Sequence, residues 1–159
     1  MTAPEISLEQ VEAEETELQF AGFSEDDAWE LGSALVRTAR SAGAPVAVDV
    51  TRHGHQLFHA ALPGSSPDND RWIERTARVV DRFGHSSLYV RLLCERDGTT
   101  MAEKFLLDPR EYAAHGGAFP LLVRKVGPVG TVVVSGLPQL EDHRMVVAAL
   151  REHLARTRA

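Results

Sequence analysis

The chain has 159 residues, of which 43% are hydrophobic and 25% charged, and its formal net charge at pH 7 is −6. This composition is typical of one globular domain, and it excludes a strongly basic protein that neutralises nucleic-acid phosphates. A single cysteine, Cys94, excludes an intrachain disulfide framework and a cysteine-rich zinc module.

No apolar run approaches the roughly 20 residues that a membrane-spanning helix needs. Residues 1–5 offer neither the basic region nor the apolar segment of a secretory signal, so we expect a cytoplasmic location. We therefore expect neither a membrane nor a nucleic acid as a partner.

Acidic residues are concentrated at the start of the chain. Residues 1–36 hold ten Asp and Glu residues and no Lys or Arg, which gives them a formal charge of −10. The remaining 123 residues hold thirteen acids and seventeen bases, so they carry a formal charge of +4. An acidic arm thus precedes a weakly basic body.

Two helices are expected first, over residues 7–20 and 24–42. Ser7 is a suitable N-cap with Gln10 three residues later, as in a capping box. Ser24 caps the second helix, and Gly43 ends it. The apolar face of the first helix is thin, whereas that of the second is typical of a core helix.

The middle of the chain predicts a hairpin followed by helices. Residues 45–51 and 56–62 alternate around a turn that contains Gly54, which is typical of a β-hairpin. Helices are expected over residues 68–83 and 86–95. Residues 100–107 are ambiguous, with a strand slightly favoured, and a short helix should run from Asp108 to the glycines at 116 and 117.

The last third predicts strands at 119–123 and 129–135, with a turn at 127–128, and a closing helix from residue 139 or 140 to 154. The strands come in adjacent pairs and the helices are segregated. This order predicts an α+β fold with a mainly antiparallel sheet.

Several segments resemble one known family. The run GGAFP at 116–120, followed by GTVVVSG at 130–136 and EDH at 141–143, resembles the motifs of the haem-degrading-domain family, which includes HbpS-like and GlcG-like proteins. The run LPGSSPDN at 62–69, with the pairs WI at 72–73 and RF at 82–83 and the run SSLY at 86–89, looks like its uncharacterised cytoplasmic branch. The resemblance covers roughly residues 20–155.

This resemblance implies a profilin-like or PAS-like sheet with helices on both faces. It also implies a homo-oligomer built from dimers, often an octamer or decamer, and haem binding or degradation in a few members. We expect one domain over residues 1–159, with an acidic helical arm at 1–22 and a core at 23–155. Where the branch commonly has Arg-Lys, this chain has Arg75-Thr76, so a contact from that lysine is absent.

The start of the closing helix is the first candidate ligand-binding site. Asp142 and His143 follow closely after Ser135, and an acid and an imidazole beside a glycine turn suit a general base or a ligand site. The alternative is that Asp142 caps the helix and that His143 makes a structural hydrogen bond. Adjacent side chains on a helix point about 100° apart, so these three residues should not form a hydrolytic triad.

Trp72 and Arg75 form a second candidate, because residues three apart share one helix face. They could offer an aromatic wall and a carboxylate clamp to a small anionic ligand, or they could anchor a subunit interface.

His85 is the third candidate, at a helix junction. Haem iron takes a His, Met, Cys or Tyr ligand, and His85, Tyr89, His115 and His143 are all possible, although no spacing selects one. The alternative for His85 is a junction cap. The histidines at 53, 55 and 59 are better explained by an exposed turn than by a metal site, although His59 could reach a ligand from the sheet.

These observations favour an oligomeric protein that binds a small ligand, possible examples being haem or another anionic metabolite. Two alternatives stay open. One is a non-enzymatic assembly protein with no small ligand, in which the acidic first helix docks a partner or a neighbouring subunit. The other is a haem-degrading enzyme. The catalytic residues and the cofactor are not identified by the sequence.

Overall fold

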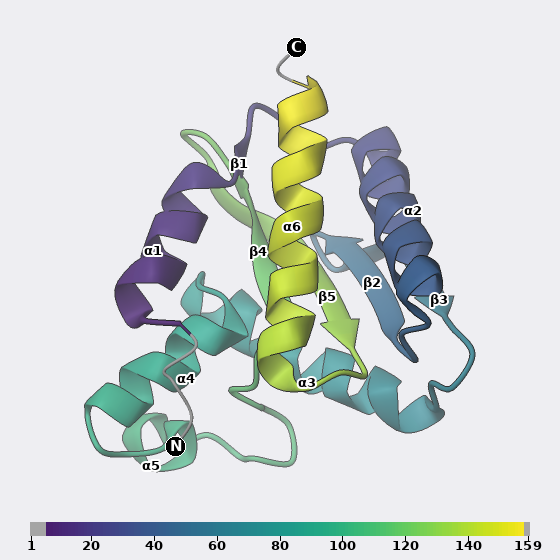
Figure 1. Cartoon of the computed structure of the whole chain (residues 1–159). Helices are drawn as coiled ribbons and strands as arrows, with labels where there is room; N and C mark the ends of the chain where they lie inside the picture. Colours follow the sequence, from purple (N-terminus) through teal and green to yellow (C-terminus); the bar gives the residue numbers. More distant parts are fainter. Residues whose placement is uncertain (1–5, 158–159) are drawn as a thin grey trace.

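Five strands form one sheet in the computed structural model, which describes residues 6–157 (Figure 1). They are β1 (Gln19–Phe20), β2 (Ala47–Arg52), β3 (His55–Ala61), β4 (Ala118–Val123) and β5 (Gly127–Ser135). Their order across the sheet is β1-β4-β5-β2-β3. All neighbours pair antiparallel except β1 and β4, which are parallel. The predicted α+β fold with a mainly antiparallel sheet is confirmed.

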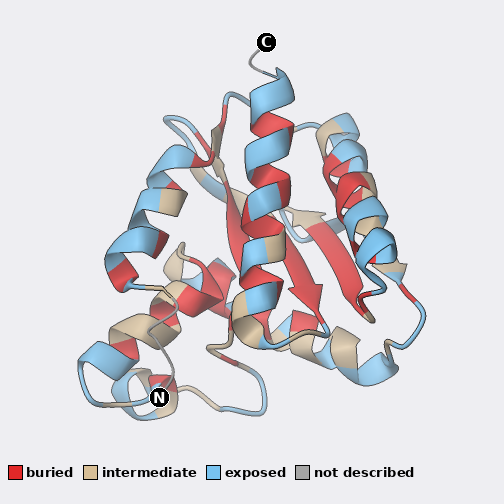
Figure 2. Cartoon of the chain, viewed as in Figure 1, coloured by how far each residue is buried: buried red, intermediate tan, exposed pale blue. Residues whose placement is uncertain are grey.

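Helices pack on both faces of this sheet, as expected (Figure 1). They are α1 (Leu8–Glu17), α2 (Glu25–Ala42), α3 (Pro67–Phe83), α4 (Ser87–Arg96), α5 (Met101–Phe105) and α6 (Gln139–Thr157). On β5, Val132 and Val134 belong to the main core with α2 and α6, whereas Val133 faces Ile73 and Val80 of α3. Figure 2 shows the resulting buried strands between the helices.

Local sequence signals account for most element boundaries. Ser7 and Ser24 both form capping boxes, and Gly43 ends α2 in the left-handed conformation. The β2–β3 turn has positive φ at His53 (52°) and Gly54 (76°), as a two-residue type I′ hairpin turn requires. Both residues are exposed, as predicted for this turn.

Three expectations were wrong. Residues 101–105 form the short helix α5 rather than a strand, because Thr100 caps it through the Glu103 amide. Asp108 begins a single turn rather than a helix, and the extended segment that follows is hydrogen-bonded to α3 through the Ala113 amide and the Arg75 carbonyl. Residue 127 belongs to β5, and the turn lies at 124–126.

The first helix is also shorter than expected. It ends at Glu17, and residues 19 and 20 leave it to pair with Leu122 and Val123 of β4. Among the described residues, no helix is long and apolar enough to span a bilayer.

The acidic α1 packs against its own chain through three glutamates. Glu14 contacts His143 on α6, Glu15 contacts His85 before α4, and Glu17 pairs with Arg151 on α6. Glu15 is buried and also accepts a hydrogen bond from the Ser86 amide.

Candidate functional site

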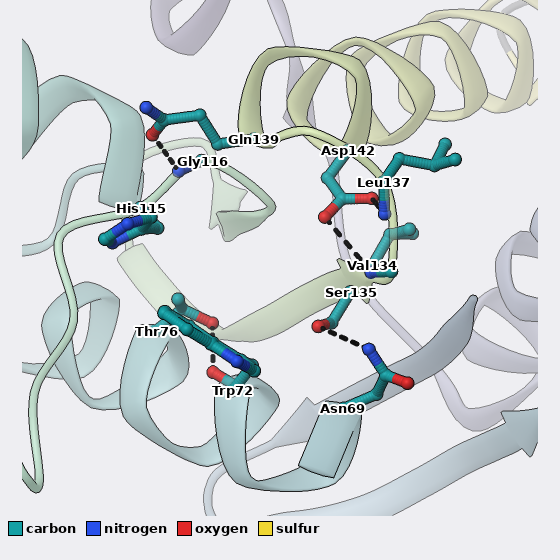
Figure 3. A pocket seen from close by; sticks show the side chains of 11 residues that line it. Asn69, Trp72, Thr76, His115, Gly116, Val134, Ser135, Leu137, Gln139 and Asp142 are labelled. Atoms are coloured by element: carbon teal, nitrogen blue, oxygen red, sulfur yellow. Dashed lines mark hydrogen bonds between the residues drawn. The ribbon is translucent and has the colours of Figure 1, made fainter. Parts of the chain in front are cut away.

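A cavity of about 250 Å³ lies between α3, the end of β5 and the start of α6 (Figure 3). We call it the Asp142 cavity. Residues from four segments line it. They are Asn69, Trp72 and Thr76 of α3, His115 and Gly116 of the loop before β4, Val134 to Leu137 at the end of β5 and in the turn that follows, and Gln139 and Asp142 of α6.

The spacing of the α3 residues explains why they meet here. Positions 69, 72 and 76 lie three and four residues apart, so they occupy one face of the helix. The opposite wall depends on the β5–α6 turn, where Gly136 has a φ of 150°. A Cβ at Gly136 would overlap the Pro45 carbonyl oxygen, so the turn needs glycine for both its conformation and its close approach.

Asp142 is the electrostatic centre of this cavity. Its side chain is only 5% exposed, and its carboxylate accepts hydrogen bonds from the Leu137 amide at 3.0 Å and the Gly136 amide at 3.3 Å. Burial raises the pKa of Asp142 to about 7, against the lowering effect of these two amides. Near neutral pH the group can therefore either donate a proton to an acceptor or pair with a cation.

The other polar groups surround Asp142 at the cavity wall. Ser135 is almost buried, and its hydroxyl accepts a long hydrogen bond of 3.4 Å from the Asn69 amide. The side-chain oxygen of Gln139 accepts from the Gly116 amide at 2.9 Å. The Thr76 hydroxyl donates to the Trp72 carbonyl, which leaves its lone pairs as acceptors. The cavity thus offers both donors and acceptors to a small molecule.

His115 and Trp72 form the aromatic part of the wall, with ring centroids 4.9 Å apart. Burial lowers the pKa of His115, and the nearby Arg91 and Arg75 lower it further, so its imidazole is neutral at pH 7. Its Nδ1 is buried, and it has no hydrogen-bond partner among the described residues.

The structure brings together three of the six predicted site residues, Trp72, Ser135 and Asp142. Arg75 is next to them but does not line this cavity. Its guanidinium lies 4.5 Å from the Trp72 ring centroid and donates to the Pro109 carbonyl at 2.7 Å. It lines a separate cavity, described below.

His143 and His85 lie elsewhere. His143 is 1% exposed, and its Nε2 lies 2.7 Å from a Glu14 carboxylate oxygen, so it faces α1 while Asp142 faces the cavity. The predicted divergence of these adjacent side chains, which excludes a hydrolytic triad, is confirmed. His85 lies 2.6 Å from Glu15, whose hydrogen bond raises the pKa of His85, and its ring stacks on Tyr89.

Other residues complete the comparison with the sequence. His59 reaches Asp70 at 2.8 Å rather than the Asp142 cavity. Within residues 6–157, no group of three or more His, Cys, Asp or Glu side chains is arranged to hold a metal ion. Sequence reasoning missed Thr76 and Gln139 as cavity residues. The helical spacing from Trp72 to Thr76 was the available signal for Thr76, whereas Gln139 carried none.

Comparisons with known proteins agree with this fold. A sequence model of the family described as "Haem degrading protein HbpS-like" matches residues 23–151. A UPF0303 protein of Streptomyces avermitilis is 56% identical over 150 residues, which cover 94% of this chain and 92% of the relative.

Two solved structures extend the comparison. The crystal structure of the Ybr137w protein has a TM-score of 0.89 and 36% identity, covering 98% of this chain and 91% of that one. A PduOC:heme complex has a TM-score of 0.68 and 19% identity, covering 82% and 94%, which shows a shared fold. From the match over residues 23–151 and the 56% identical relative, the chain belongs to the HbpS-like haem-degrading-protein family.

Proposed function

We propose that the chain is a binding protein for a small polar molecule, which occupies the Asp142 cavity and contacts the carboxyl group of Asp142. The observation that carries this proposal is the buried carboxyl at the cavity wall, with its pKa raised to about 7. Strongly perturbed ionisable groups in a concave site are more frequent at functional sites than elsewhere. A purely structural cap would not need a cavity beside it.

The lining residues indicate the kind of ligand. Among the described residues that line the cavity, Asp142 and His115 are the only ionisable ones, and none is Lys or Arg. An ionised Asp142 would repel an anion, so a ligand that presents a hydrogen-bond donor or a cationic group fits better here. Trp72 suits a flat or apolar part of the same molecule.

The test is native mass spectrometry of the chain after purification without denaturant, compared with Asp142→Asn. We expect an added small-molecule mass on the wild type and its loss from the variant. Glu141→Gln is the matched control, because Glu141 is exposed in the same helical turn and does not line the cavity. An unliganded wild type, or equal occupancy in Asp142→Asn, would contradict the proposal.

Haem is a second candidate ligand, supported by the family description and by the PduOC:heme relative. The Asp142 cavity, at about 250 Å³, lies below the roughly 300 Å³ at which pockets for drug-sized ligands begin, so this cavity alone does not enclose a haem. A haem would have to lie at the surface or between two copies, and His115 is the imidazole at this cavity that it could reach.

A haem titration tests this second candidate. A shifted Soret band in the wild type that is lost in His115→Ala but kept in His55→Ala, at an exposed histidine, would support it. An unchanged free-haem spectrum in the wild type would refute it. The homo-oligomer stays a prediction, which light scattering of the purified chain tests.

A further inference from the structure

A second cavity of about 250 Å³ lies under the segment that follows α5, between that segment, α3 and α4. We call it the Arg75 cavity. Its wall is largely apolar, with contributions from Met101, Pro109 and Tyr112, and it includes the side chains of two arginines, Arg75 and Arg91. His115 lines both this cavity and the Asp142 cavity.

The charge of Arg75 lacks a counter-charge in the part of the chain that the structure describes. Arg91 is paired with Glu95 at 3.0 Å, and both line the cavity. For Arg75, no ion pair with a carboxylate is found within residues 6–157. Its hydrogen bond goes to the Pro109 carbonyl, and its Nε is buried with no partner among the same residues.

An anion would complete this arrangement. A buried or half-buried charge without a counter-charge is destabilising, and so is a buried donor without an acceptor. The guanidinium carbon lies 4.5 Å from the centroid of the Trp72 ring, and this contact restricts the position of the guanidinium before a planar partner binds.

We propose that the Arg75 cavity binds a small monocarboxylate, whose carboxylate group pairs with Arg75 and whose apolar part lies against Met101 and Tyr112. A guanidinium and a carboxylate match in planar, two-bond geometry. The apolar wall disfavours a phosphate, which would leave several of its oxygens without donors. This site goes beyond the proposed function, because it lies in a different cavity and takes the opposite charge.

Binding can be followed through Trp72, which touches Arg75. In a Trp29→Phe background Trp72 is the only tryptophan, and Trp29 is 65% exposed, so its replacement should be tolerated. At constant ionic strength, butyrate should change the Trp72 fluorescence saturably and bind about tenfold more tightly than acetate, because it buries two further methylene groups. Butyramide, the uncharged analogue, should bind at least tenfold more weakly than butyrate.

Two arginine variants separate anion binding from support of the segment. Arg75→Gln should weaken butyrate binding at least tenfold. Arg78→Gln is the matched control, since Arg78 donates to the Glu111 carbonyl at 3.0 Å in the same segment but does not line the cavity. Equal loss in both variants would show that only the segment's position matters, and it would overturn the proposal.

A measurement on the unmodified chain covers the case in which Arg75→Gln fails to fold. Arg75 and Arg91 help to lower the pKa of His115, so a bound carboxylate should raise that pKa in an NMR titration with butyrate, and butyramide should not. The proposal is wrong if His115 titrates identically with and without butyrate, or if inorganic phosphate binds more tightly than butyrate.

Discussion

Asp142→Asn should become increasingly more stable than the wild type as the pH rises from 5 to 8. The pKa of Asp142 is raised from 3.8 to about 7 in the folded chain, so the folded state holds a proton that the unfolded state releases across that range. A raised folded-state pKa gives stability that is complete below the unfolded pKa and is lost as the pH rises through the folded one. The free energy of unfolding of the wild type should therefore fall by roughly 3 kcal/mol from pH 5 to pH 8.

Asp142→Asn replaces the carboxyl group with an amide, which does not titrate in this range. The amide has one hydrogen-bond acceptor oxygen where the carboxylate has two. Its oxygen can accept from the Leu137 amide, whereas its NH₂ group would face the Gly136 N–H. That mismatch costs about 1 kcal/mol at any pH. At pH 5 the unfolded chain has already released most of the Asp142 proton, so the wild type has lost part of this stability and the two proteins should differ by less than about 1 kcal/mol. At pH 8 we expect the variant to be more stable than the wild type by about 3 kcal/mol.

Urea unfolding at pH 5, 6.5 and 8 measures this effect. With an m-value of about 2 kcal/mol/M, a change of about 3 kcal/mol shifts the midpoint by about 1.5 M. Histidines also titrate in this range, but they are common to both proteins and cancel in the difference. Glu141→Gln should keep most of the pH dependence of the wild type, because the charge of Glu141 is the smallest of the causes that raise the pKa of Asp142. A difference between wild type and Asp142→Asn that is the same at pH 5 and pH 8 would refute the reasoning.

Three further predictions concern the scaffold. Gly130→Ala should lower the free energy of unfolding by at least about 3 kcal/mol or prevent folding, because its Cβ would overlap the carbonyl oxygen of Thr51 on the neighbouring strand. Gly22→Ala is the control: it has open space around it and should change the urea midpoint little. Leu106→Gly should raise the free energy of unfolding by about 0.5–1 kcal/mol in thermal melts, since Leu106 is 88% exposed and has a φ of 56°. Glu15→Gln should speed hydrogen exchange in α1, and most strongly below pH 6.5. The pKa of its partner His85 is raised in the folded chain, so the stability that the Glu15–His85 pair contributes is present at low pH and is lost as the pH rises. An exchange rate that matches the wild type at pH 6 would count against this pairing.

Elements with local signals were predictable from the sequence. Ser24 and Gly43 mark the two ends of α2, and the alternation of β2 and β3 around His53 and Gly54 marks the hairpin. Each of these signals acts within a few residues, so the sequence contains the whole cause.

Elements without such signals were not predictable. The helix α5 has five residues, too few to display a period, and it ends at Leu106 rather than at a glycine. The strand β1 has two residues and depends on β4, about a hundred residues later in the chain. Its existence is a tertiary effect, which local propensity does not encode.

The candidate site shows the same division. Residue type singled out Asp142 and Ser135 at one candidate site and Trp72 at another, and the structure places all three at the wall of one cavity. Residue type also singled out His143, but its partner Glu14 lies 129 residues away in the chain, and no pattern in the sequence predicts that pair. A histidine is a candidate ligand only until its fold-dependent partner is known.

The Glu14–His143 pair shows where part of the acidic start of the chain binds. Glu14, Glu15 and Glu17 project from α1 onto two histidines and an arginine of the body, and the pair of Glu17 with Arg151 balances part of the acidic charge within the chain. The first turns of α6 carry Asp142 toward the cavity and His143 toward α1. Because a helix turn moves as a unit, the position of α1 and the geometry of the Asp142 cavity depend on the same few residues. Removal of α1 should therefore change the geometry of the Asp142 cavity.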